Sequence, residues 1–475
     1  MNKILRFTSR TAALTYQTCR RKRFLANHYA STGLSPESID LNLETGSSVH
    51  RGLQHLFEHC RKEHPDGNFE EKCINDSIEV AIDLFRKDLT EHSIALRGEE
   101  SMFLSFIIAE HECLIEGLIR CFAIRRLPEL LEEYEIIEVE LDELYTEFSP
   151  IVYWQSRADA AFLTKDYSKG VIVCSIKTAS EYADVTLRNI ITDMQGNSEW
   201  AAIDARLKRD FKQFVSNEED GTGHLEAIDI RWHKYFNWCY ANNQIPKVYA
   251  VQYEHLITGL WRDTDKSGLR KRQSFLVHPY KLEVMGGINA FTGTKSFSPS
   301  AYKWKVNPGK QPKGWNKVDI WDDIGIKNWI EMLATGQVQA EYGNPLDELI
   351  KTSDLVIRAT EADNSRIEEW LISTRFQEET IISNLEILEQ YAEAARKTND
   401  WRLYEKTLMQ FFPKDTQQCW NYYGHDCQFT KVCHEGCNLQ ELVEAGIYIP
   451  RTPHHDGEKK YFVEKGLIKD DNSNS

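Results

Sequence analysis

One aspartate and one lysine stand in two short segments that are predicted to form neighbouring strands. Asp159 lies in the stretch QSRADA at 155–160, and Lys177 lies in the stretch VCSIKT at 173–178. Metal-dependent phosphodiester hydrolysis needs a divalent cation held by carboxylates and a lysine that positions the attacking water. The two residues therefore predict a site for that chemistry, if the fold brings the two strands together.

A second group of reactive side chains lies near the C-terminal end of the sequence. Four of the eleven cysteines, Cys419, Cys427, Cys433 and Cys437, fall within nineteen residues, at intervals of seven, five and three residues. Solitary buried cysteines have apolar neighbours, whereas these have polar and bulky ones. Two metals fit the pattern: zinc, which prefers closer pairs and could also use a histidine, and an iron–sulfur cluster, which accepts four thiolates.

The order of these motifs resembles that of RecB-like nucleases of the PD-(D/E)XK superfamily that carry an iron–sulfur cluster, and in particular phage-type relatives. Asp159 and its neighbours resemble the G-x-[IA]-D motif, and Lys177 with Thr178 resembles the [DE]-x-K-T motif. The segment from Gly46 to His50 is similar to the G-x-x-x-H helix, and Gln195 loosely resembles the start of the Q-x-x-x-Y helix.

That resemblance implies roles for the residues that match. Asp159 and His50 would bind Mg²⁺ or Mn²⁺, Lys177 would be the catalytic lysine, and Gln195 would position the DNA strand or the lysine. The implied activity is a deoxyribonuclease, an exonuclease acting on DNA ends or single strands, with recombination or replication proteins as further partners.

The resemblance also implies ligands for a structural [4Fe-4S] cluster that joins the two ends of the chain. In this family an N-terminal cysteine that follows an aromatic residue supplies the first ligand, as Cys19 after Tyr16 would do here. Three C-terminal cysteines supply the rest, which assigns Cys419, Cys427 and Cys433. Cys437 is then spare or replaces one of them.

One position departs from the family pattern, because Ser175 stands where the acidic residue of [DE]-x-K is expected. A hydroxyl is a poor Mg²⁺ ligand compared with a carboxylate. Either a carboxylate comes from a neighbouring strand, with Glu138 and Glu140 as candidate metal ligands, or the protein is a catalytically degenerate DNA-binding or scaffold protein. A zinc-stabilised interaction protein is a third interpretation.

The composition limits the kinds of partner. The net charge of −16 over 475 residues argues against general polyanion binding, so DNA would have to meet local basic patches. The beginning of the sequence has no apolar signal segment and no stretch approaches 18 apolar residues. We therefore expect a cytoplasmic protein that does not enter a membrane. The candidate basic patches are 20–23, 206–212 and 266–272.

The spacing of apolar residues predicts the elements that must position these side chains. Residues 49–60, 78–89 and 101–127 have helical spacing, 134–141, 151–163 and 171–178 read as three consecutive strands, and 347–397 reads as largely helical. The predicted fold class is α/β, with a mixed central sheet flanked by helices, as in a restriction-endonuclease-like core. The predicted regions are a helical region at 1–130, the nuclease core at 131–285, a Trp-rich connection at 286–345, a helical region with the cluster cysteines at 346–440, and a tail at 441–475.

Overall fold

A computed structural model describes most of the chain outside the Trp-rich connection. The described residues are 6–63, 70–92, 94, 104–179, 194–219, 230–257, 260–264, 270–273, 350–358, 361–415, 419, 427–435, 437–453 and 455–466. The predicted connection at 286–345 lies outside them.

The core is a six-stranded mixed sheet in which β4 (Val152–Thr164) is the longest strand. β3 (Tyr134–Tyr145) runs antiparallel along one edge of β4. The opposite edge is shared, because parallel β1 (Arg6–Ser9) pairs with β4 near its start and antiparallel β5 (Val171–Ala179) pairs with it near its end. The sheet continues through β6 (Val248–Ile257), parallel to β5, to β9 (Ile350–Arg358), antiparallel to β6. The predicted α/β class with a mixed central sheet is confirmed.

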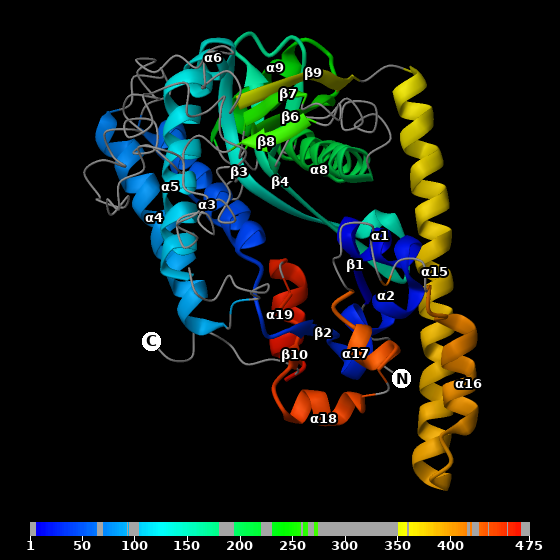
Figure 1. Cartoon of the computed structure of the whole chain (residues 1–475). Helices are drawn as coiled ribbons and strands as arrows, with labels where there is room; N and C mark the ends of the chain where they lie inside the picture. The colour runs from blue at the N-terminus through cyan, green and yellow to red at the C-terminus, as the bar shows by residue number, and fades with distance from the viewer. Residues whose placement is uncertain are drawn as a thin grey trace, which may run out of the picture.

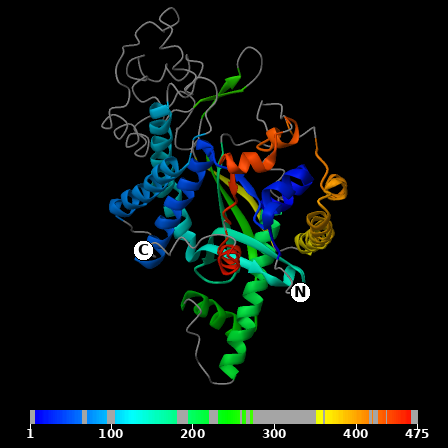
Figure 2. The same ribbon diagram turned by 90° about the horizontal axis from the view of Figure 1, so that it is seen from below.

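Helices cover both faces of the sheet (Figure 1). On one face α3 (Leu41–Lys62), α4 (Glu71–Glu91) and α5 (Leu104–Cys121) bury an apolar cluster against the strands. On the other face α8 (Met194–Glu219) and α9 (Ile230–Ala241) bury a second cluster, to which α15 (Glu361–Thr398) contributes. Figure 2 shows α3–α5 and the α8–α9 pair on different sides of the strands.

The position of α3 depends on two glycines. The helix begins after Asp40, whose side chain accepts a hydrogen bond from the N–H of Asn42 and so caps the first turn. At Gly52 a Cβ would lie 2.4 Å from a side-chain carbon of Ile119, and at Gly46 it would lie 2.9 Å from Thr178 Oγ1. Both glycines therefore allow close approach, and Gly46 holds the start of α3 against the end of β5.

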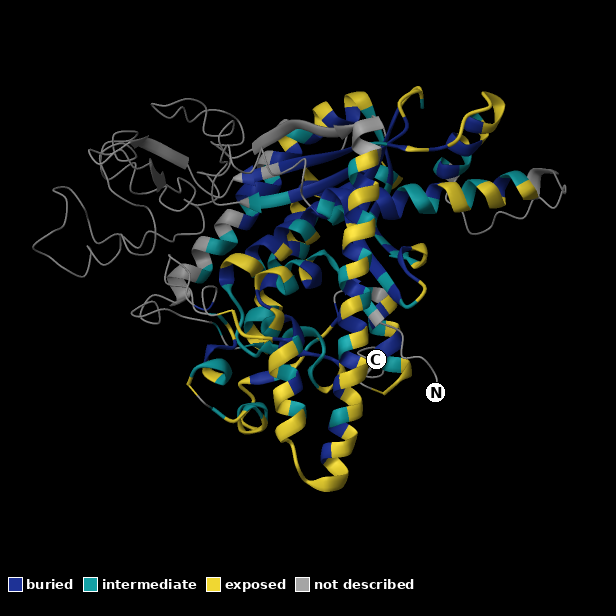
Figure 3. Ribbon diagram, turned by 90° about the vertical axis from the view of Figure 1, so that its right-hand side faces the viewer, coloured by how far each residue is buried: buried dark blue, intermediate teal, exposed yellow. Residues whose placement is uncertain are grey.

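The two ends of the described chain lie side by side. β2 (Leu34–Pro36) pairs antiparallel with β10 (Tyr448–Pro450). The hairpin of α15 and α16 (Arg402–Phe411) packs beside α1 (Arg10–Thr18) and α2 (Arg20–Asn27), and Figure 3 shows exposed residues along its outer surface and tip.

The remaining elements are η1 (Tyr29–Ser31), η3 (Phe122–Arg126), α6 (Leu127–Glu133), η4 (Thr146–Phe148), β7 (Leu260–Thr264), β8 (Arg270–Gln273), α17 (Thr430–Cys433), α18 (Leu439–Glu444) and α19 (Asp456–Glu464).

The strand β9 differs from its sequence-based expectation, as do β1 and β2 within the region 1–130 that was predicted to be helical. Residues 350–358, expected to be helical, form the strand β9. Its apolar run of Leu355, Val356 and Ile357 is short and compatible with either structure. Pairing with β6, which lies far away in the sequence, stabilises the strand conformation of these residues over a helix.

A buried ion pair connects α2 to α15. Arg23 Nη2 lies 2.9 Å from Glu378 Oε2, and each side chain is 1% exposed. The same nitrogen donates a hydrogen bond to Thr8 Oγ1 of β1 at 3.2 Å. Arg23 thus joins the N-terminal segment, the sheet and the C-terminal helix at one point.

We expect Glu378→Gln to lower the free energy of unfolding by about 3 kcal/mol, because it leaves the Arg23 charge buried without a counterion. Urea denaturation measures the change. Asp400→Asn is the matched control: it breaks the exposed pair with Arg402, in which the side chains are 45% and 89% exposed, and should change the free energy of unfolding little, because water screens an exposed pair. Equal small losses in the two variants would contradict the role given to Arg23 and Glu378.

Candidate active site

Asp159 lies in a gap on one edge of β4. β1 pairs with β4 as far as Gln155, and β5 pairs with it from Ala160 onward. Beyond Cys174, β5 leaves β4 and continues beside β6. Asp159 fills the resulting fork, where its Oδ2 accepts a hydrogen bond of 2.6 Å from the backbone N–H of Ile176.

His50 approaches the same carboxylate from α3. Its Nδ1 lies 2.8 Å from Asp159 Oδ1, and the two side chains are 28% and 25% exposed. His50 is one turn after Gly46, whose close approach to Thr178 sets the height of the helix over the fork. The structure therefore brings together His50 and Asp159, which lie 109 positions apart in the sequence.

Lys177 lies on β5, one residue beyond the backbone group that holds Asp159. Its charge lowers the pKa of Asp159 and also that of Glu199, so it is close enough to act on both carboxylates. Burial opposes ionisation of Asp159, but the charge and hydrogen bond of His50, the charge of Lys177 and the N–H of Ile176 together hold its pKa below the usual range. Asp159 is therefore the ionised member of the site at neutral pH.

Glu199 is a member of this group that the sequence motifs did not predict. Ser175 Oγ donates a hydrogen bond of 2.6 Å to Glu199 Oε2, and Gln195 Nε2 donates one of 2.6 Å to Glu199 Oε1. Gln195 Nε2 also lies 3.3 Å from Ser175 Oγ. Glu199 occupies the position four residues after Gln195, where the Q-x-x-x-Y motif would have its tyrosine. That spacing, one turn of helix, was the available signal.

The environment of Glu199 differs from that of Asp159. Glu199 is only 1% exposed, and burial raises its pKa to about 7, although Lys177, Ser175 and Gln195 act in the opposite direction. Two neighbouring carboxylates thus have pKa values displaced in opposite directions. Such divergence is typical of functional sites, although structural networks also produce it.

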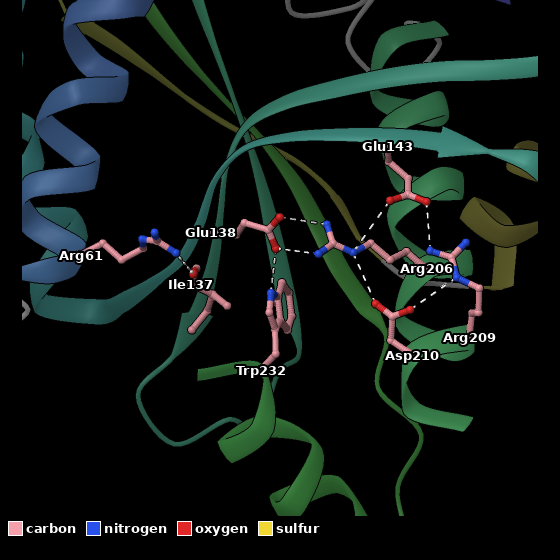
Figure 4. A network of polar contacts seen from close by, with 8 residues as sticks. All are labelled: Arg61, Ile137, Glu138, Glu143, Arg206, Arg209, Asp210 and Trp232. Carbon is pink, nitrogen blue, oxygen red and sulfur yellow. Dashed lines mark hydrogen bonds and ion pairs between the residues drawn. The ribbon is translucent and has the colours of Figure 1, made fainter. Parts of the chain in front are cut away.

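Glu138 belongs to a different network, on the α8–α9 side of β3 (Figure 4). Its two carboxylate oxygens accept hydrogen bonds of 3.0 and 2.9 Å from Arg206, and Trp232 Nε1 donates a further one of 2.7 Å. The neighbouring Glu140 lies between Val139 and Leu141, which pair with Ala160 and Ala158, so its backbone is opposite Asp159. Its φ of 49° lies in the left-handed region, which is strained for a glutamate.

The basic residues of α8 are largely neutralised. Arg206 and Arg209 lie within 4 Å of the carboxylates of Glu143 and Asp210, and Lys208 lies 2.5 Å from Asp204. Arg23 of the first patch is buried against Glu378. These arginines and Lys208 therefore form ion pairs within the protein, and they do not provide a free basic surface.

The structure brings together the four cysteines assigned to the cluster. The Cys427 N–H donates a 2.9 Å hydrogen bond to the Cys419 carbonyl, and Cys19 and Cys427 both act electrostatically on the thiols of Cys419 and Cys433. Burial is the main reason that the pKa values of the Cys419 and Cys433 thiols are raised. Two other candidates lie close by: His434 Nε2 is 3.1 Å from Cys419 Sγ, and the Cys437 N–H bonds to the Lys431 carbonyl.

Within the described ranges, no three or more His, Cys, Asp or Glu side chains form, as they stand, a group that could hold a metal ion. At the fork, His50 and Asp159 are bonded to each other, and Glu199 is bonded to Ser175 and Gln195. The donor types nevertheless fit a hard divalent cation, since they are carboxylates and an imidazole beside a lysine.

No protein-family model matches the sequence, and no curated protein is significantly similar to it. Among the helices that the structure describes, none has the length and apolar character to cross a membrane.

The raised pKa of Glu199 predicts a pH-dependent stability. The pKa of the Glu199 carboxyl is about 7 in the folded protein, against an ordinary value of 4.5. The folded state therefore binds the proton more tightly than the unfolded state does. The resulting contribution to the free energy of unfolding is complete below pH 4.5 and is lost as the pH rises through 7. In metal-free buffer, Glu199→Gln should therefore stabilise the protein at pH 8 relative to the parent, by at most about 3 kcal/mol, and should make little difference at pH 4. Urea denaturation at the two pH values measures this, and an equal effect at both would contradict the assignment.

Proposed function

We propose that this protein is a metal-dependent DNA nuclease that acts on DNA ends or single strands. The observation that carries the proposal is the fork between β4 and β5, where Asp159 bonds to the Ile176 N–H and to His50 beside Lys177. An imidazole, a carboxylate and a lysine, which metal-dependent phosphodiester hydrolysis can use, thus come from α3, β4 and β5 to one region of the sheet.

Each residue has a role that follows from its surroundings. Asp159, held in its ionised form, and His50 would bind Mg²⁺ or Mn²⁺, and Lys177 would orient the attacking water. When bound, the cation would activate that water and stabilise the negative charge that develops on the phosphate. Gln195, which reaches both Ser175 and Glu199, would hold the neighbouring polar groups in place.

The arrangement of elements supports a restriction-endonuclease-like core. The meander of β3, β4 and β5, followed by α8 and then by β6 parallel to β5, places the aspartate and the lysine on adjacent strands. Fold alone does not establish function. The proposal therefore depends on the fork and its side chains.

We also propose that Cys19, Cys419, Cys427 and Cys433 bind a structural [4Fe-4S] cluster. Support comes from their nearness across 414 positions of sequence and from the chemistry of four thiols in one place. Cys19 caps the start of α2, and Cys433 ends α17, so a cluster here would join the N- and C-terminal segments.

The nuclease proposal is tested by incubating end-labelled single- and double-stranded DNA with anaerobically purified protein and Mn²⁺. The parent should cut, and Asp159→Asn should be slower by at least about 100-fold, because it removes the ionised ligand. Asp166→Asn is the matched control: Asp166 is exposed in the β4–β5 turn, bonded to Ser168, and its substitution should leave the rate unchanged.

Two results would change the conclusion. Equal metal-dependent cutting by the parent and Asp159→Asn would exclude the fork as the active site. Binding of DNA without cutting by the parent would favour the alternative of a degenerate DNA-holding protein, for which Ser175 is the supporting observation.

The cluster proposal predicts about four iron and four sulfide ions per chain, with broad visible absorbance, in protein purified without oxygen. Cys19→Ser should lower the iron content and the absorbance, whereas Cys437→Ser should leave both unchanged. One tightly bound zinc in colourless protein would overturn the iron–sulfur assignment, and loss of iron in Cys437→Ser would make Cys437 a ligand.

A further inference from the structure

We infer that Glu199 of α8 supplies the metal-binding carboxylate that β5 lacks at Ser175. This inference rests on the proposed nuclease site and adds a third ligand to it. Glu199 lies beside the motif position itself, since its Oε2 accepts the 2.6 Å hydrogen bond of the Ser175 hydroxyl. The acidic group is therefore present next to the strand, although it comes from a different element.

The size of Ser175 makes room for this arrangement. Ser175 is fully buried and Glu199 is 1% exposed, so the two side chains share one closed space. An aspartate or glutamate at 175 would bring a second negative charge into contact with the Glu199 carboxylate, which is unfavourable at low exposure. The serine instead donates a hydrogen bond, so that serine and glutamate form a matched pair.

The strongest argument is that Glu199, although the charge of Lys177 acts on it, has no ion-pair partner in contact. Five glutamates of the described chain are buried, and four of them have an arginine partner: Glu143 with Arg209, Glu254 with Arg126, Glu378 with Arg23, and Glu458 with Arg451. Within the described residues Glu199 has no cationic nitrogen within 4.0 Å, and its bonded partners Ser175 and Gln195 are neutral. Burying an unpaired carboxylate is unfavourable, and a bound cation would compensate it.

The fold holds Glu199 in place by contacts further along α8. Arg206, seven residues or about two helical turns later, forms the bidentate pair with Glu138 of β3. On the preceding turn Gln195 bonds to both Glu199 and Ser175. Because α8 is fixed to the sheet at both points, Glu199 is presented to the fork from a rigid element.

The chemistry indicates which ion this site would take. Two carboxylates, Asp159 and Glu199, with one imidazole, suit Mg²⁺ or Mn²⁺ and not a soft metal that prefers thiolates. Lys177 acts electrostatically on both carboxylates, so a cation bound by both would lie beside the lysine that the reaction needs.

Titration of the metal-free protein with Mn²⁺, followed by calorimetry, tests the inference without reference to cleavage. Glu199→Gln keeps the shape of the side chain and should weaken Mn²⁺ binding by at least about 10-fold while the protein stays folded by circular dichroism. Asp204→Asn, an acid-to-amide change in the same helix, keeps an oxygen that can accept the Val248 N–H and loses the pair with exposed Lys208, so it should bind Mn²⁺ as the parent does. The double variant Ser175→Asp with Glu199→Gln should recover much of the lost affinity, because it returns a carboxylate to the strand.

The outcomes separate the two proposals. Unchanged Mn²⁺ affinity in Glu199→Gln, or no Mn²⁺ binding by the parent, would overturn the role of Glu199. Mn²⁺ binding that depends on Glu199, in a parent that cuts no DNA, would uphold this inference and overturn the nuclease. With an active parent, Glu199→Gln should cut at least about 100-fold more slowly, and the double variant should regain activity.

Discussion

The site depends on how one long strand divides its hydrogen bonds. β4 gives one edge to β3 along its length, while β1 and β5 share the other. On this second edge, between the last β1 pair and the first β5 pair, no strand of the described residues pairs with β4, and buried backbone groups need partners. Asp159 meets this need on the β5 side, where its carboxylate accepts the Ile176 N–H. The same bond that closes the fork therefore aims the other carboxylate oxygen at His50.

Ion pairs, hydrogen bonds and paired strands join the two ends of the described chain. Arg23 bonds to Thr8 and Glu378, Arg21 Nε donates a 2.8 Å hydrogen bond to the Phe412 carbonyl, and β2 pairs with β10. β1, which forms one side of the gap in β4, lies directly before α1 and α2. A cluster bound by Cys19 and the C-terminal cysteines would therefore stabilise the segment that feeds the sheet, and would influence the fork without contacting it.

The sequence predicted the parts of the fold that local patterns determine. The meander of β3, β4 and β5 follows from apolar runs separated by turns, and the nearness of His50 to Asp159 was expected from the order of motifs. By contrast, β9 was expected to be helical, because its short apolar run becomes a strand only through pairing with β6. Glu199 was missed for a related reason. Its proximity to Ser175 arises only when α8 packs on β5, whereas the sequence pointed to acids on the preceding strand. Glu138, one candidate there, is bonded to Arg206 and Trp232.

The contrast between Glu138 and Glu199 shows how the surroundings of a carboxylate indicate its task. Glu138 is about a quarter exposed and is matched by a bidentate arginine and an indole, so its charge is satisfied within the protein. Glu199 is deeply buried with neutral donors only, and burial holds its pKa near 7. A site that stabilised its own fold best would have an arginine there. Keeping a carboxylate that has no ion-pair partner near Lys177 and Asp159 is unfavourable for the metal-free protein, and under our proposal a bound cation would compensate for it. That is the electrostatic condition under which a cation from solution, rather than a side chain, completes the fold.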